Sequence, residues 1–478
     1  MAKILCILGM MLSSMFALLS DDSNFSWLYI PWALLTLIIA FITYNEERNV
    51  DVKKFWLRPS IICLLSITIV GYQLCIDDVL DFSSIEETIF SGATHYADCC
   101  FFSAAAFIFA YLLGLRTKAN IFMKLRVGYI SQKYAAIWLI LMIFSFILFV
   151  SSIDISFFLS GAAYHGSGAA DYNFTTSNTY EGLYQTLFYI TLASYTLLIN
   201  ESKTQSNSFS IYFRGIPILF WICVILYLIL RLFSGDRGPV IYNSLAIVYG
   251  YIWFSKIKFK FSMVVIAILM GASLVSFWGT FRSRDSDLSI IEKINDSIDR
   301  RSDMDNKSIL PFTKELAESE DTHFMAVRDM SNQRSSYSCG KFTLFSLTSA
   351  VPGLKRQYLY NLGFKPGELD SATYFSISSM GNNYSFGEGS SMFGEAYLEF
   401  SIWGMIIFGL LLGIIYKQLD TSLMQCSHIS VIGLAIILKL SAQAIYMGRT
   451  SFAIELGSIL HLIVMYFIIN IAVKIVSK

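Results

Sequence analysis

Residues 231–243 read RLFSGDRGPVIYN and join two long apolar runs, 215–233 and 239–255. The charged side chains are confined to the connection and its edge, while each run approaches the roughly 20 apolar residues that a helix needs to cross a bilayer. Glycines punctuate the connection, and Pro239 suits the first turn of a helix, where its missing N–H costs nothing. The stretch predicts two membrane helices joined by a tight turn.

The same pattern continues along the chain in both directions. Of its 478 residues, 55% are hydrophobic and 15% charged, which is too apolar for a soluble core inside a charged shell. We therefore expect an all-α polytopic membrane protein with about 12 transmembrane helices. The twelve apolar runs are 4–20, 27–44, 59–76, 98–115, 134–152, 182–199, 215–233, 239–255, 262–280, 395–416, 429–448 and 452–473.

The first run, 4–20, has two interpretations. Lys3 precedes it and the small residues of FALLSDD close it, as in a secretory signal. The second run begins only a few residues later, which favours a helix that is retained.

The placement of basic residues predicts the orientation of the spans. One set of alternate loops contains 18 Lys and Arg residues, whereas the opposite short loops contain only Arg237 and Arg449. By the positive-inside rule the first set is cytoplasmic, together with both termini. Three regions follow: residues 1–280 form the first nine spans, residues 281–394 a large outer loop, and residues 395–478 the last three spans.

The outer loop changes character along its length. SDLSIIEKINDSIDRR, residues 286–301, places most of its Leu and Ile residues on one helical face. This pattern is typical of an amphipathic helix on the membrane surface, or of a helix packed on its own loop. The later part of the loop and the beginning of the next run, residues 358–400, are rich in Gly, Ser and Tyr and include Tyr374, Tyr384 and Tyr397. Such a segment is either a lid whose tyrosines bind sugar or a low-complexity loop.

Several classes of function are disfavoured by the sequence. It contains no CxxC, HExxH, GxGxxG or P-loop pattern, so the usual metal and nucleotide sites are not indicated and no cofactor is expected. Its 35 basic and 35 acidic residues give no net positive field for nucleic acid. The eight cysteines lie mostly in or beside apolar runs and do not indicate a disulfide framework.

Arg237 and Arg449 are the two basic exceptions in the short outer loops. Each directly precedes a predicted span, so the unpaired N–H groups at a helix N-terminus face the same surface as a guanidinium. Thr450 and Ser451 are candidate caps for the last span. This arrangement favours binding of a phosphate, because a planar guanidinium can donate to two oxygens. The alternative is that both arginines extend to lipid headgroups or cap a neighbouring helix.

Two segments resemble the O-antigen polymerase (Wzy) family. They are SGDRGPVIYNSLAIVYGY, residues 234–251, and GEGSSMFGEAYLEFSIWGMIIFGLLLGIIY, residues 387–416. The chain departs from the family pattern in the second segment, where Glu399 and Ser401-Ile402-Trp403 stand in a stretch that often reads Asn-Phe-Gly.

The resemblance implies a GT-C-like fold in the bacterial inner membrane, with an active site facing the periplasm. It implies metal-independent transfer of a glycan from undecaprenyl pyrophosphate to a hydroxyl of the next lipid-linked repeat unit. Lipid-linked oligosaccharides are the implied partners, and a chain-length regulator protein is a further possible one. In this scheme Arg237, Arg449, Arg282 and Arg284 are candidates to bind pyrophosphate, Tyr374, Tyr384 and Tyr397 to bind glycan, and Glu395, Asp236 and His165 to act as general base.

Two other functions remain open. An O-antigen ligase would share the plan of spans and outer loop. A flippase or other transporter would need charged residues near the middle of the membrane, where Lys439 is the one charge that the spans offer.

Overall fold

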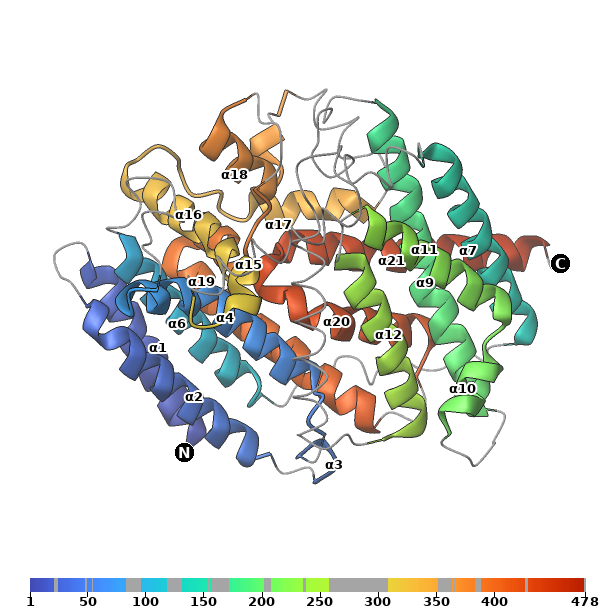
Figure 1. Cartoon of the computed structure of the whole chain (residues 1–478), viewed down its shortest axis with the longest axis horizontal. Helices are drawn as coiled ribbons and strands as arrows, with labels where there is room; N and C mark the ends of the chain where they lie inside the picture. Colours follow the sequence, from blue (N-terminus) through green and yellow to red (C-terminus); the bar gives the residue numbers. More distant parts are fainter. Residues whose placement is uncertain are drawn as a thin grey trace, which may run out of the picture.

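The structure is a computed structural model that describes residues 1–20, 25–47, 50–53, 55–82, 96–117, 131–153, 155, 172–201, 208–234, 238–257, 308–350, 363–364, 366–382, 388–425 and 429–476. Every regular element in these ranges is a helix, which confirms the all-α class for the described part (Figure 1). The described residues 308–350, 363–364 and 366–382 of the predicted outer loop are called the outer segment. The helices before it are α1 (Ala2–Leu19), η2 (Ser26–Leu28), α2 (Tyr29–Asn45), α3 (Val50–Lys53), α4 (Pro59–Val79), α6 (Ala97–Gly114), α7 (Gln132–Ser152), α9 (Tyr172–Glu201), α10 (Phe209–Gly215), α11 (Ile218–Phe233) and α12 (Gly238–Ser255). Those that follow are η6 (Pro311–Thr313), α15 (Lys314–Ala317), η7 (Glu318–Glu320), α16 (Asp321–Ser331), α17 (Lys341–Ser346), η8 (Leu347–Ala350), η10 (Pro366–Glu368), α18 (Ser371–Met380), α19 (Met392–Gln425), α20 (Val431–Gln443), η11 (Ala444–Arg449) and α21 (Phe452–Val476).

Nine helices in the described ranges are long and apolar enough to cross a membrane, so the chain is a multi-pass membrane protein by length and composition. They correspond to nine of the twelve predicted runs. The remaining three differ. The run 215–233 forms α11, which is shorter than the nine, and the chain bends by 96° at the beginning of this run, between α10 and α11, where Pro217 precedes the new helix. The run 239–255 forms α12, which is less apolar than the nine. The run 262–280 lies outside the described residues.

The closest helix packing is between α6 and α19. A side-chain carbon at Gly413 would stand 2.1 Å from the Tyr111 carbonyl oxygen, and one at Gly409 would stand 2.4 Å from the Phe107 carbonyl oxygen. Small residues at such crossings let two backbones touch, which is how helices associate where lipid removes the hydrophobic driving force. Helix α6 also packs against α1 and α4, and its side chains are buried along nearly its whole length. It is the central helix of this part of the bundle.

The two ends of the bundle carry the two predicted sets of loops. At one end Glu46 pairs with Arg116 at 2.9 Å, and Glu47 pairs with Lys417. At the other end the Phe25 backbone N–H donates to Asp98 at 2.9 Å. Three loops of the basic set therefore meet at one end, and two loops of the opposite set meet at the other.

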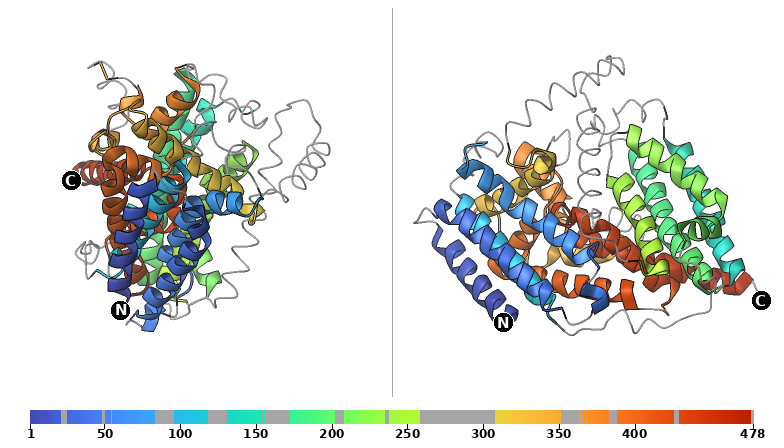
Figure 2. Two further views of the ribbon diagram at one scale, coloured as in Figure 1. Left: turned by 90° about the vertical axis from the view of Figure 1, so that its left-hand side faces the viewer. Right: turned by 60° about the horizontal axis from the view of Figure 1, so that its bottom comes forward.

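The described part of the outer segment, from η6 to α18, covers the second end (Figures 1 and 2). Ser308 donates to Asp77 near the end of α4, and α15 packs against the same helix. Helix α16 packs against α6 and α19. The outer segment is thus fixed to three spans.

Helix α19 is broken inside its apolar run. Phe400 (φ −147°, ψ 25°) and Ser401 (φ 55°, ψ −141°) have non-helical backbone angles. Glu399, just before the break, accepts hydrogen bonds from the Gly340 and Thr343 N–H groups at the start of α17. The break separates a short outer helix, which carries Glu395 and Tyr397, from the membrane span proper.

Candidate functional site

Arg449 lies at the outer end of η11, on the side of the molecule covered by the outer segment. Its side chain is about half-buried, and its Nη1 lies 3.4 Å from Glu315 Oε1 on α15. Two residues later, Ser451 accepts a hydrogen bond from the Ile454 N–H at 3.1 Å. Ser451 is therefore the side chain that caps α21, as one of the two predicted candidates. An Arg beside a capped helix N-terminus provides positive charge at this surface.

Glu395 lies at the same helix N-terminus but is fully buried. Its Oε1 accepts from the Ala453 N–H at 2.8 Å, and its Oε2 accepts from the Ser371 hydroxyl at 2.6 Å and from the Ser451 hydroxyl. Both oxygens are thus engaged, and the negative charge faces the positive end of α21. In this geometry the carboxylate joins α18, α19 and α21.

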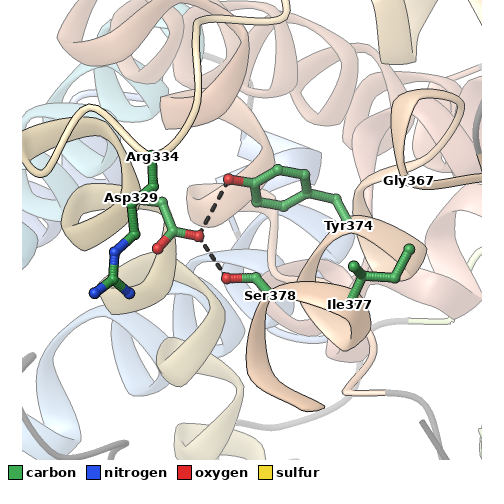
Figure 3. A pocket seen from close by; sticks show the side chains of 6 residues that line it. All are labelled: Asp329, Arg334, Gly367, Tyr374, Ile377 and Ser378. Atoms are coloured by element: carbon green, nitrogen blue, oxygen red, sulfur yellow. Dashed lines mark hydrogen bonds between the residues drawn. The ribbon is translucent and has the colours of Figure 1, made fainter. Parts of the chain in front are cut away.

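Tyr374, one turn after Ser371 on α18, lines a pocket of about 290 Å³ in the outer segment (Figure 3). The other lining residues are Asp329, Arg334, Gly367, Ile377 and Ser378. The Tyr374 hydroxyl and the Ser378 hydroxyl both donate to Asp329 Oδ2, at 3.1 and 2.5 Å. Burial and the nearby Asp329 carboxylate raise the pKa of Tyr374 to about 12, so the phenol stays protonated. The volume and the mix of ring, carboxylate and guanidinium suit a sugar residue.

Tyr397 occupies a different environment from Tyr374. It is buried, its hydroxyl lies 3.7 Å from Cys99 Sγ on α6, and its ring centroid lies 5.8 Å from that of His323. The side chain packs between spans and the outer segment. It does not line the Tyr374 pocket.

The structure brings three of the predicted site residues into one connected arrangement. Glu395 is bonded to Ser371, at the start of the helix that carries Tyr374, and to Ser451, in the turn that follows Arg449. One buried carboxylate thus joins the helix that carries Tyr374 to the turn that follows Arg449. Six other predicted residues lie outside the described part of the chain: His165, Asp236, Arg237, Arg282, Arg284 and Tyr384.

Sequence reasoning missed a second buried polar group. His323 Nδ1 lies 2.8 Å from Glu320 Oε1, and His323 Nε2 lies 3.1 Å from Ser103 Oγ on α6. The three-residue spacing of Glu320 and His323 on a helical segment is the signal that could have paired them. Ser103 carries no such signal, because only the packing of α16 on α6 brings it into contact.

The segment around this group is acidic. Burial raises the pKa of Glu318, Glu320 and Asp321 above their ordinary values, and for Asp321 the neighbouring carboxylates add to the effect. Arg449 and Lys314 partly offset this rise at Glu318. Within the residues that the structure describes, no three His, Cys, Asp or Glu side chains are grouped to hold a metal ion.

No protein-family model, curated protein or solved structure matches the chain. The support for the candidate site is therefore the geometry of its residues alone.

Proposed function

We propose that the chain is a glycosyltransferase of the inner membrane that polymerises lipid-linked oligosaccharide repeat units into O-antigen or a related surface polysaccharide. In this proposal the helices form a GT-C-like arrangement, both termini are cytoplasmic, and the site around Arg449 faces the periplasm. The growing glycan leaves undecaprenyl pyrophosphate and joins a hydroxyl of the next lipid-linked unit. The observation that carries the proposal is the bonded path from the Tyr374 pocket through Glu395 to the turn that bears Arg449.

The chemistry requires two things that this arrangement can supply. The bond between the anomeric carbon and the pyrophosphate oxygen breaks, so negative charge grows on the leaving group, and a fixed guanidinium stabilises that charge. The acceptor and the donor must also be held in line, which a shaped sugar pocket on a rigid support favours. Arg237, as part of the same proposal, would provide a second guanidinium.

A lipid-linked oligosaccharide flippase is the second candidate. Lys439 favours it, because this residue is buried within α20 and ionisable residues inside membrane spans often mark transport pathways. An O-antigen ligase shares the features of the first proposal and differs in its acceptor.

The test is to express Arg449→Ala, Arg449→Lys and Lys341→Ala separately in a strain lacking this gene. Lys341 is the control, because it is an exposed cation of the outer segment. At equal membrane abundance, we expect long chains to be lost in Arg449→Ala while single repeat units still reach the surface, by analogy with the roughly hundredfold effect of losing one transition-state donor. Arg449→Lys should be intermediate or equally defective, and Lys341→Ala normal.

Two results would redirect the proposal. Long chains in Arg449→Ala would mean that this arginine only anchors the turn through Glu315. Loss of single units as well would favour the flippase or the ligase.

A further inference from the structure

Lys439 is a buried cation in the middle of an apolar helix. Its side chain is 8% exposed, and its Nζ lies 5.3 Å from the centre of the Tyr189 ring on α9. The described residues offer its ammonium group no hydrogen-bond acceptor and no carboxylate within 4 Å. Glu455, in the first turn of α21, is the charged group that interacts with it. An ammonium ion inside a membrane is costly unless it has a counter-charge and polar contacts, so this pair indicates a functional site.

Glu455 differs from Glu395, although both lie near the start of α21. Thr450 Oγ1 and Ser458 Oγ approach the Glu455 carboxylate only at 3.4 Å, whereas Glu395 accepts three short hydrogen bonds. Glu455 is also half-buried, whereas Glu395 is fully buried. The carboxylate of Glu455 is therefore held by longer hydrogen bonds than that of Glu395, and it lies nearer the surface.

The polar atoms around this pair are incompletely satisfied. Gln443 lies one turn beyond Lys439 on α20, is half-buried, and is within hydrogen-bonding reach of Glu455. Its Oε1 and the hydroxyl of Tyr189 have no hydrogen-bond partner among the described residues. Buried polar groups normally find partners, so these two atoms have the capacity to form hydrogen bonds with a ligand.

The chemistry of these groups points to a neutral, hydroxyl-rich ligand. The lysine and the glutamate balance each other's charge, which disfavours a net anion or cation. The site offers donors and acceptors together, and sugar hydroxyls can satisfy both kinds. Gln443 and Glu455 are half-buried, whereas Lys439 and Tyr189 are buried.

We propose that Lys439, Glu455, Gln443 and Tyr189 form the subsite for the acceptor sugar, separate from the Tyr374 pocket. This inference rests on the proposed glycosyl transfer. Glu455 accepts a hydrogen bond from the attacking hydroxyl and takes its proton as the hydroxyl oxygen bonds to the anomeric carbon. The bond from that carbon to the pyrophosphate oxygen breaks, and its electron pair leaves with the pyrophosphate. The positive charge of Lys439 favours the ionised carboxylate, so Lys439 is a positioning residue.

The first experiment measures polymerisation by the purified full chain, using lipid-linked repeat units extracted from a strain that lacks this gene. The titratable groups that face Glu455 are Lys439 from α20, Tyr189 from α9 and Tyr416 from α19. We expect the wild-type rate to fall at acidic pH as Glu455 is protonated, and we expect Glu455→Gln to lower the rate on the order of a hundredfold and to remove that fall. Glu455→Asp should recover part of the rate. Asp81→Asn is the control, because Asp81 is an exposed outer carboxylate with φ 56°, a conformation that Asn also adopts.

A rate for Glu455→Gln within threefold of wild type, or an unchanged acid limb, would overturn the subsite. Loss of single repeat units together with long chains in the Arg449→Ala strain would instead count against the proposed function and favour the flippase or the ligase. The two failures are therefore distinguishable.

The second experiment does not depend on activity. Gln443→Cys is labelled with a membrane-impermeant thiol reagent in a Cys339→Ser background, because Cys339 is the exposed cysteine among those described. Ser441→Cys is the control, since Ser441 is fully buried and lies two residues from Gln443, on the opposite side of α20. We expect labelling at Gln443→Cys alone, and we expect lipid-linked repeat units to slow it. A cationic reagent should label this cysteine faster than an anionic one, and the Glu455→Gln substitution should abolish that difference. No labelling at Gln443→Cys, or no protection by the lipid-linked units, would overturn the subsite.

Discussion

The imidazole of His323 and the carboxyl group of Glu320 meet at 2.8 Å, and both side chains are almost completely buried. Burial lowers the pKa of His323 to about 3 and raises the pKa of Glu320 well above its ordinary value. Both directions favour a neutral pair, in which protonated Glu320 donates to Nδ1 and the Nε2–H donates to Ser103 Oγ. This chain of hydrogen bonds fastens the outer segment to α6.

Acid should therefore weaken the protein through His323. Between an ordinary unfolded pKa of about 6.5 and the folded pKa of about 3, the unfolded state binds a proton that the folded state does not. His323 contributes a loss of up to about 1.4 kcal/mol per pH unit as pH falls through this range. Glu320 acts in the opposite sense, since its raised pKa favours folding at low pH and that contribution is lost as pH rises through the folded value.

The measurement is thermal unfolding in detergent between pH 7.5 and 4.5, for wild type and His323→Gln. The variant should be less stable at neutral pH but lose less stability on acidification. Parallel pH profiles for the two proteins would show that His323 does not titrate on unfolding.

The Tyr374 pocket predicts a graded response to substitution. Tyr374→Ala removes the ring face and should shorten the polysaccharide, with about tenfold weaker use of substrate for a loss of about 1.4 kcal/mol. Tyr374→Phe keeps the ring and loses the hydrogen bond to Asp329, worth about 1 kcal/mol, so it should be milder. Chain-length distribution on gels is the readout. Tyr337→Ala is the control, since Tyr337 is 42% exposed and does not line the pocket. Equal effects of the Tyr337 and Tyr374 variants would remove the pocket from the site.

The orientation of the chain can be checked with fused reporters. A reporter that works only outside the cytoplasm should be active when fused after Ser331 or Gly381, in the outer segment. It should be silent when fused after Lys256, which directly follows the C-terminal end of α12. Reporters that work only inside should give the reverse pattern. A silent fusion at both outer positions would place the outer segment in the cytoplasm and contradict the proposed function.

Much of the fold follows from local sequence. Nine apolar runs become spans because helix length and apolarity are local properties, and Ser451 caps α21 because capping needs only neighbouring residues. The bend before α11 has a local cause in Pro217 and lies at the beginning of the predicted run 215–233, so the run does not include the helix α10 before it. The break at Ser401 depends on distant contacts of Glu399 with α17, so no local pattern predicts it.

The site also combines features that local sequence predicts with features that depend on contacts between distant residues. The position of Arg449 beside a helix N-terminus was predictable, because the arginine and the helix are adjacent in sequence. The role of Glu395 was not, because its partners Ser371 and Ser451 come from two other helices. The pocket combines Asp329 with Tyr374, which are 45 residues apart, and only the packing of α16 on α18 brings them together.

The break in α19 leads to a prediction about Gly404. A side-chain carbon at Gly404 would stand 1.9 Å from the Ala396 carbonyl oxygen, because the short outer helix folds back against the span at this point. Gly404→Ala must push the two pieces apart, and we expect a loss of at least about 1–3 kcal/mol in stability. Gly182→Ala is the matched control, since nothing lies within 4 Å of its new carbon on α9, and Ala at an exposed helix position should be neutral or add about 0.5–1 kcal/mol. Unfolding temperature in detergent and membrane abundance are the readouts.

Because Glu395 and Glu399 both lie on the short outer helix, Gly404→Ala should also shorten the polysaccharide per molecule of folded protein, whereas Gly182→Ala should not. Equal stability of the two variants would show that the outer helix and the span do not approach each other as closely as the structure has them.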